Sequence, residues 1–258
     1  MPTTYAHYRF GAEMLRLMPA DIRGTAKRYR RLFDAGLYGP DLFFYYRPMV
    51  SVRIRRLGHK FHMQTGREFF AKACRTLRLE PGEEGYAYLY GVLCHYTLDA
   101  QCHPLVAQAE REGFVRHMQI ETEFDRFLMG RDGVTETHLE DTMVLNPWSG
   151  ETVARFYPGT DKAIVLESLR SMARIRRILD RPPGAVGKTL VKTMALGSET
   201  FRDMIPGQAS DTACGHWNEL LLERYRQAAE MFPDMLLRLT AHLTYNAPLG
   251  EKFDPVFG

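Results

Sequence analysis

The stretch EEGYAYLYGVLCHYTLDAQC, from Glu83 to Cys102, decides the fold. It is apolar on almost every face of a helix, which is typical of a helix buried on all sides. The sequence on either side of it has helical periodicity and few strand signals. We therefore predict an all-α fold around this central helix, with Pro104 just beyond its end.

The flanking segments predict the surrounding helices. A first helix is predicted to end with the stretch 12–18, before Pro19. A second is predicted over 22–35, with Asp21 as its N-cap. An aromatic run at 42–46 ends at Pro48. We expect further helices over 66–80, 115–129, 163–179 and 217–243, the last with Pro233 as a kink or break. Residues 132–159 are predicted to be loop with short helical pieces.

The chain shows no repeat, low-complexity tract or linker composition. It is therefore predicted to be a single all-helical domain over 1–258. Its metal-site half reaches to about residue 130, and 131–258 forms a helical C-terminal half. Six of the nine histidines lie in the first half, and the role of the second half is left open.

The composition of the chain excludes several classes of protein. The 258 residues are 45% hydrophobic and 25% charged, which excludes a disordered or fibrous chain. The formal net charge of +3 is too small to indicate a nucleic-acid coat or a polybasic anchor. No apolar stretch has the length of a membrane span, and the start MPTTYAHYRFG lacks the features of a signal peptide. Four cysteines do not make a disulfide scaffold, so we expect a soluble, cytoplasmic protein.

Three polar residues interrupt the apolar central helix. His95, Asp99 and His103 lie at i, i+4 and i+8 and form one stripe along a helix face. A carboxylate and two imidazoles in such a place are costly unless they are paired or bind a metal. His117 and Glu121 repeat the i, i+4 spacing one helix later, which allows one metal ion to bind both. Single pairs of this kind are mostly surface salt bridges, but the three-residue stripe in a buried helix favours metal.

Eight residues of ligand type follow one another along about the first 125 residues. They are His7 in TTYAHYRFG, Asp41 in GLYGPDLFFYY, His62 in LGHKFHMQTGREFF, His95, Asp99 and His103 in LCHYTLDAQCHP, and His117 with Glu121. Their order and local sequence resemble the zinc-dependent phospholipase C family. That superfamily also contains single-strand-specific zinc nucleases on the same all-helical fold.

The resemblance implies two or three zinc ions in a cleft among the helices. The ligands it implies are Asp41, His62, His95 and Asp99 for one ion, His103, His117 and Glu121 for a second with a position left for water, and His7 with a bridging Asp99 for a third. In secreted members the N-terminal amine and carbonyl also bind the third zinc. His7 lies too near Met1 for that spacing, so this site is expected to be altered, weak or empty. The spacer between Asp99 and His103 is also shorter than in some secreted members.

Some candidates have competing interpretations. His59 competes with His62, which we favour because Gly58-x-x-x-His62 leads into Thr65-Gly66. The aromatic run Phe43, Phe44, Tyr45 and Tyr46 could line a substrate pocket, but core packing is favoured. Arg53, Arg55 and Arg56 could contact phosphate, but a solvated basic edge is favoured.

Several other residues of functional type are not predicted to belong to the site. Cys94 and Cys102 lie about 100° around the helix from their histidine neighbours and are predicted to be small buried residues. The stretch GAVGKT at 184–189 lacks the glycine spacing and the preceding strand of a P-loop. The three later histidines lack ligand spacing and are expected to be structural or exposed; they are His138, His216 and His242.

The resemblance implies a zinc-dependent phosphodiester hydrolase of the phospholipase C type. Bound zinc would hold the phosphate and acidify a water, and Asp41 is the candidate general base. The expected substrate is a phosphodiester small molecule or a phospholipid head group. A nuclease or nucleotidase of the same fold is the close alternative, which the modest net charge disfavours for long nucleic acids. A metal-binding protein that kept the fold and lost turnover is the third.

Overall fold

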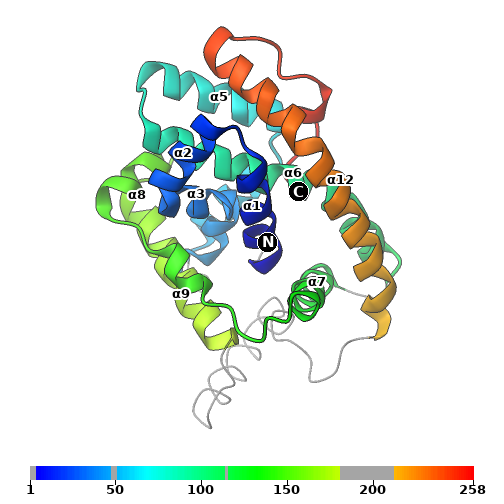
Figure 1. Ribbon diagram of the computed structural model, residues 1–258. Helices are drawn as coiled ribbons and strands as arrows, with labels where there is room; N and C mark the ends of the chain where they lie inside the picture. Colours follow the sequence, from blue (N-terminus) through cyan, green and yellow to red (C-terminus); the bar gives the residue numbers. More distant parts are fainter. Residues whose placement is uncertain (1–3, 48–50, 114–115, 181–211) are drawn as a thin grey trace.

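The protein is helical over the residues that the computed structural model describes, which are 4–47, 51–113, 116–180 and 212–258 (Figure 1). No strand forms within these ranges, and an isolated bridge joins Thr65 to Val256. The predicted all-α fold is confirmed. The α-helices are α1 Tyr5–Leu17, α2 Ala20–Arg28, α3 Arg30–Gly36, α4 Val52–His62, α5 Gly66–Leu79, α6 Glu83–Arg111, α7 His117–Asp132, α8 Pro147–Ala154, α9 Lys162–Asp180 and α12 Thr212–Tyr245. The short 3₁₀ helices within the described ranges are η1 Gly39–Tyr45, η2 Leu139–Met143 and η3 Glu251–Phe253.

Helix α6 forms the centre of the molecule, with the other helices around it (Figure 1). It packs most extensively against α3 and α12, and also against α1, α2 and α5. Every residue from 87 to 100 is buried. Burying a large apolar side chain contributes about 1.5–3 kcal/mol, so this helix supplies much of the apolar burial that holds the fold together.

Helix α6 continues to Arg111, so the prediction that it ends before Pro104 is wrong. Proline lacks the N–H that bonds to the carbonyl four residues earlier, and its ring crowds that carbonyl. The residues that follow remain packed, since Leu105, Val106 and Ala109 are all buried. Tertiary packing therefore outweighs the local preference of proline.

The first part of the chain differs most from the prediction. Helix α1 runs from Tyr5 to Leu17, so it ends within the stretch 12–18 as predicted, but η1 and α4 were not predicted. The helix expected over 22–35 is two helices, separated at Tyr29 with φ −109° and ψ 44°. Pro19, not Asp21, is the N-cap of the first of them. Periodicity is judged over a window of many residues, so a break confined to one residue leaves it unchanged.

Most of the other predicted helices are confirmed within three residues at each end. Helix α5 begins at a capping box, in which the Thr65 hydroxyl accepts from the Glu68 N–H at 3.2 Å and the Glu68 carboxylate accepts from the Thr65 N–H at 3.3 Å. Helix α12 passes through Pro233 and is longer than predicted. The short elements η2 and α8 occupy the region predicted as loop with helical pieces. That the chain is a single domain stays a prediction.

Two glycines allow α3 to lie directly on α6. A Cβ added to Gly91 would lie 3.0 Å from the Gly36 Cα, and one added to Gly36 would lie 2.9 Å from the Gly91 Cα. Ordinary contacts between carbon atoms are about 3.5–4.0 Å, so neither position accepts a side chain without a shift. This close crossing places Leu37 and η1, which follow Gly36, beside the polar residues of α6.

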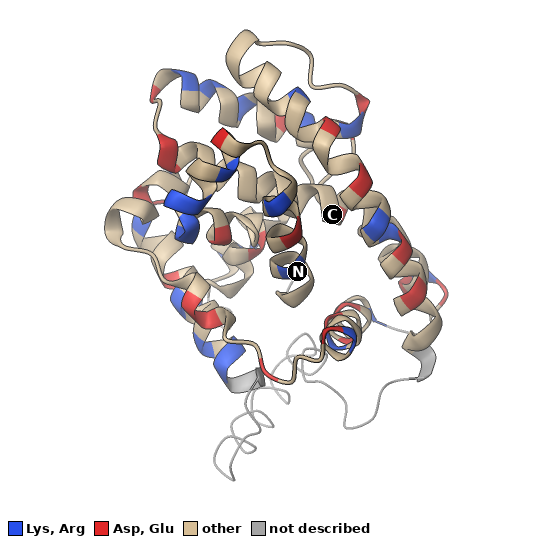
Figure 2. Ribbon diagram, in the orientation of Figure 1, with Lys and Arg blue, Asp and Glu red and all other residues tan. Residues whose placement is uncertain are grey.

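The surface carries both signs of charge. Figure 2 shows acidic and basic residues interspersed along α9 and α12, in agreement with the small net charge of +3. Within the described part of the chain, no helix is both long and apolar enough to cross a bilayer. The stretch 184–189, which was compared with a P-loop, lies outside the described residues.

Candidate metal centre

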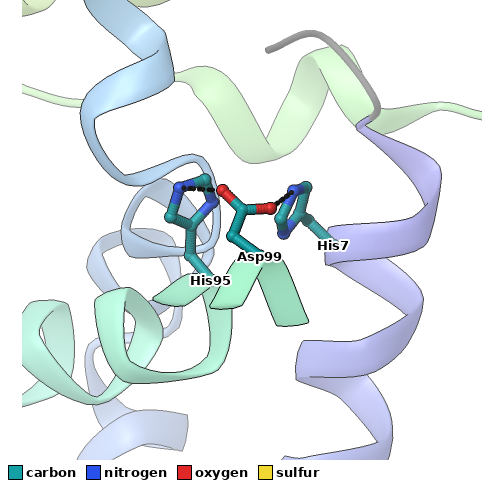
Figure 3. A group of neighbouring side chains, drawn as sticks. All are labelled: His7, His95 and Asp99. Carbon is teal, nitrogen blue, oxygen red and sulfur yellow. Dashed lines mark ion pairs between the residues drawn. The ribbon is translucent and has the colours of Figure 1, made fainter. Parts of the chain in front are cut away.

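His95, Asp99 and His103 follow one another at successive turns of α6, and all three are buried. The Asp99 carboxylate lies between two imidazoles, with Oδ2 3.1 Å from His95 Nε2 and Oδ1 3.2 Å from His7 Nε2 (Figure 3). The same Oδ1 is 3.9 Å from His103 Nε2. The rings of His7 and His95 stack with their centroids 4.4 Å apart. Asp99 therefore joins histidines from two helices.

His7 reaches this cluster because α7 fixes the first turn of α1. The Asp125 carboxylate accepts the N–H groups of Thr4 and Tyr5 at 3.0 Å and that of Ala6 at 2.8 Å. The first turn of a helix leaves such N–H groups without partners, and a carboxylate there also complements the helix dipole. Asp125 thus explains how α1 can begin as early as Tyr5.

The 3₁₀ helix η1 brings Asp41 next to His95. Gly39 has φ +46°, and a Cβ at this position would overlap the His95 ring, so only glycine allows the chain to turn this close to the imidazole. Asp41 Oδ1 lies 2.6 Å from His62 Nε2, and both residues are buried. His59 is exposed on the surface of α4. The structure therefore brings His62, rather than His59, to Asp41.

Helix α7 contributes His117 and Glu121 on one face. Glu121 Oε1 is 3.2 Å from His117 Nε2 and 3.5 Å from His103 Nε2. Glu121 is buried, whereas the His117 side chain is 31% exposed. Asp125 continues the same i, i+4 series, and this continuation is the sequence signal through which it could have been found.

All eight predicted ligands come together in three groups, within each of which the potential ligand atoms lie within 4.8 Å of one another. The groups are His7, His95 and Asp99; Asp41, His62 and His95; and His103, His117 and Glu121. Asp99 is grouped with His7 rather than with Asp41 and His62, although His95 belongs to both groups. A cavity of about 20 Å³ is lined in part by Asp99, His103 and Glu121. That volume is enough for one water or ion.

Backbone carbonyls orient three of the imidazoles. The contacts are His62 Nδ1 to the Gly58 carbonyl at 2.9 Å, His95 Nδ1 to the Leu37 carbonyl at 3.1 Å, and His103 Nδ1 to the Phe257 carbonyl at 2.8 Å. A carbonyl only accepts, so Nδ1 donates to it and Nε2 is the nitrogen that faces the cluster, where it can bind a metal once it carries no proton. Metal-binding histidines are usually held in this way. These partners carry no sequence signal, because every residue has a backbone carbonyl.

The charges of the cluster depend strongly on one another. Burial alone would raise the pKa of Asp99, but the facing imidazoles, that of His103 foremost, hold it well below its usual range. Burial is likewise outweighed at Glu121, where His117 and His103 lower the pKa to about 2. At His103 burial would lower the pKa, but Asp99 and Glu121 raise it to about 9. The carboxylates are therefore ionised at neutral pH, which favours cations.

The donor set fits zinc. Four buried atoms of the candidate ligands make no hydrogen bond of acceptable geometry within the described ranges, although His95 Nε2 and Asp99 Oδ2 face one another at 3.1 Å. They are His95 Nε2, His103 Nε2, Asp99 Oδ2 and Glu121 Oε2. A buried polar atom left without a partner costs about 1–3 kcal/mol. Imidazole nitrogen and carboxylate oxygen are ordinary zinc ligands, and a bound ion would satisfy these atoms.

The aromatic run packs mainly in the core. Phe43 is fully buried, and its ring contacts those of Phe61 and Tyr157. Tyr45 is also buried, whereas Phe44 is only partly buried, with its ring against that of His62. The favoured interpretation as core packing is confirmed for Phe43 and Tyr45.

The remaining candidates lie at the edge of the centre or away from it. The arginines 53, 55 and 56 are exposed on α4, as a solvated basic edge would be. Cys94 and Cys102 are buried, as predicted, and burial raises the pKa of both thiols. His138 and His216 are exposed, and His242 Nδ1 contacts the Ala247 carbonyl at 2.7 Å, so the structural or exposed roles expected for them are confirmed.

The fold and the site together define an all-helical protein with three linked groups of potential metal ligands. The family model described as zinc dependent phospholipase C matches residues 6–162, which is more than half of the chain and includes all eight of these residues. The chain belongs to this family, as its sequence motifs indicated. Comparison with curated proteins and with solved structures finds no match.

Proposed function

We propose that this protein is a zinc-dependent phosphodiester hydrolase of the phospholipase C type. The observation that supports it best is the convergence of eight imidazole and carboxylate side chains, from five separate elements, in a member of the zinc dependent phospholipase C family. Buried groups of this kind are costly to bring together unless a ligand binds them. Their alignment through backbone carbonyls adds support, because it leaves Nε2 available.

Each residue has a role in this proposal. The ligands are Asp41, His62, His95 and Asp99 for one ion, His103, His117 and Glu121 for a second, and His7 with the shared Asp99 carboxylate for a third. The partial exposure of His117 leaves the second group the best access to solvent, and hence to a water and a substrate. When bound, zinc supplies charge that stabilises the phosphate in its transition state and acidifies a water towards pKa 7.

Asp41 is our candidate for the general base. Burial would raise its pKa, but the hydrogen bond with His62 Nε2 helps to hold the pKa of this carboxyl below its usual range. The carboxylate is therefore ionised at neutral pH and can accept a proton. His62, 2.6 Å away and fixed by the Gly58 carbonyl, holds the orientation of this carboxylate.

The proposed substrate is a phosphodiester small molecule or a phospholipid head group. Binding of long nucleic acids gains most of its free energy from many Lys and Arg contacts to phosphates. The net charge of +3 and the interspersed surface charges offer little of that attraction (Figure 2). We therefore rank a nuclease below a lipid or small-molecule phosphodiesterase.

Hydrolysis by the zinc-loaded protein tests the proposal. The substrates are bis(p-nitrophenyl) phosphate, phosphatidylcholine vesicles and single-stranded DNA, and zinc content is measured on the same samples. We expect turnover of the diester and the lipid, and a loss of about 100-fold or more in kcat for Asp41→Asn. His59→Ala, on the same helix as His62 but exposed, is the matched control and should keep its rate within about twofold.

Two other results would each contradict the proposal in a different way. Turnover of DNA without turnover of lipid would assign the protein to the nuclease branch instead. Full zinc loading with no turnover of any of these diesters would contradict a hydrolase and leave a metal-binding protein.

A further inference from the structure

The segment that follows α12 returns to the candidate metal centre. We call Leu249–Gly258 the returning segment; it contains η3 and lies beyond the residues that the family model matches. Its apolar side chains Leu249, Phe253 and Phe257 are buried, with 2% or less of their area exposed. It is therefore a packed part of the fold rather than a loose end.

Contacts with α5 and α6 fix the register of the returning segment. Its Val256 forms an antiparallel bridge with Thr65, and the Pro255 carbonyl accepts from the Gly66 N–H at 2.9 Å. The Tyr96 hydroxyl, on α6 next to His95, donates to the same carbonyl at 3.0 Å. The Phe257 ring lies 4.9 Å from that of Tyr96, measured between centroids.

The last two residues of this segment contact three of the candidate ligands. The Phe257 carbonyl accepts from His103 Nδ1 at 2.8 Å, and the Phe257 ring lies 6.1 Å from the His95 ring. The Gly258 N–H donates to the His62 carbonyl at 3.3 Å. These three histidines come from two of the helices that contribute to the cluster, α4 and α6.

Gly258 also lies directly against the His103 ring. A Cβ added at this position would overlap Nδ1 and Cε1 of the imidazole. The backbone can therefore pass the ring at this distance only without a side chain.

We propose that the returning segment is a positioning element of the metal centre, in which the Phe257 carbonyl holds His103 with Nε2 toward Asp99 and Glu121. This inference rests on the proposed function, because it assigns a metal-binding role to His103. Docking of the segment and binding of zinc then favour each other, and by linkage each must strengthen the other by the same factor. Outer partners of metal-bound histidines typically change metal affinity by about 10–100-fold.

Zinc affinity of the full chain provides the first test, measured by competition with a chromogenic chelator. Gly258→Ala pushes a methyl group against His103 and should weaken zinc binding by about 10–100-fold. Val256→Ala is the matched control, because it shortens a side chain that is 38% exposed on the same segment and should change affinity less than about twofold. Equal melting temperatures of the metal-free proteins show that the folds are intact. Wild-type affinity in Gly258→Ala would overturn the inference.

Hydrogen exchange of the wild-type chain provides the second test and needs no variant. The N–H of Phe257 bonds to the Gln64 carbonyl at 3.2 Å, and that of Gly258 bonds to the His62 carbonyl. Zinc should slow the exchange of both amides relative to chelator-treated protein, and equal rates would overturn the inference. A wild-type chain that takes up no zinc would instead remove the proposed function itself. Zinc uptake with no effect on these amides would remove only the role of the segment.

Discussion

Replacement of Gly91 by alanine should disturb both the fold and the candidate metal centre. The added Cβ would overlap the Phe33 carbonyl and lie 3.0 Å from the Gly36 Cα. Because carbon contacts are normally about 3.5–4.0 Å, relief of the Gly36 contact alone requires α3 to move away from α6 by about 0.5–1 Å, and relief of the overlap with the Phe33 carbonyl requires more. Overpacking of this kind costs about 1–3 kcal/mol of unfolding free energy.

Gly24→Ala measures what alanine contributes to a helix without a steric clash. Gly24 is exposed in α2, and a Cβ there would meet no atom within 4 Å. Alanine should therefore stabilise the protein at this position by about 0.5–1 kcal/mol. The difference in unfolding free energy between Gly91→Ala and Gly24→Ala isolates the steric cost, because the helix preference for alanine is common to both.

The same shift should reach the metal centre. Leu37 directly follows Gly36, and its carbonyl lies 3.1 Å from His95 Nδ1, so separation of the helices weakens the contact that orients His95. Zinc affinity should then fall by about 10-fold or more in Gly91→Ala and stay unchanged in Gly24→Ala. Urea unfolding followed by circular dichroism gives the stability, and chelator competition gives the affinity. Equal stability of the two variants would refute the close crossing.

Three further predictions follow from the site and its supports. In metal-free protein the pKa of His103 is raised from 6.5 to about 9, so its proton stabilises the fold fully below pH 6.5 and this contribution is lost as pH rises through 9. The free energy of unfolding in urea should therefore fall between pH 6.5 and pH 9, while zinc affinity rises over the same interval. Two flat profiles would contradict this coupling. Asp125→Ala leaves three N–H groups at the start of α1 without their acceptor and should cost about 2–4 kcal/mol in the same unfolding assay, with a cost below about 0.5 kcal/mol arguing against the cap. Thr65→Ala removes the capping box of α5 and should cost about 1 kcal/mol of unfolding free energy. A calorimetric scan checks this figure beside Thr76→Ala, which removes a partly exposed hydroxyl within the same helix.

Sequence periodicity predicted the helices that are long and strongly patterned. It failed where a single residue or a single distant contact determines where a helix begins, breaks or continues. The unbroken apolar character of α6 identified the centre of the fold, because only a helix buried on all sides tolerates it. The break at Tyr29 and the passage through Pro104 were not predicted. Both depend on how neighbouring helices pack, and a local pattern carries no information about that.

The candidate site divides in the same way. The i, i+4, i+8 stripe of α6 follows from helix geometry, and the order of the other ligand types followed from the family resemblance. The resemblance did not reach the partners that orient the imidazoles. The carbonyls of Leu37 and Phe257 act through the backbone, and the second belongs to a segment more than 150 residues away from His103 along the chain. No residue type marks such a contact in advance.

Metal content of the purified full chain tests the central claim most directly. The protein is prepared without chelator or nickel, and zinc is measured by elemental analysis for wild type, Asp99→Asn and Asp34→Asn. Asp34 is a buried aspartate outside the three ligand groups, paired with Arg30 at 2.6 Å, so it controls for the loss of a buried charge. We predict two or three zinc ions per wild-type chain, at least one fewer in Asp99→Asn, and the wild-type number in Asp34→Asn. Less than one zinc per wild-type chain, or equal content in all three proteins, would contradict the metal centre.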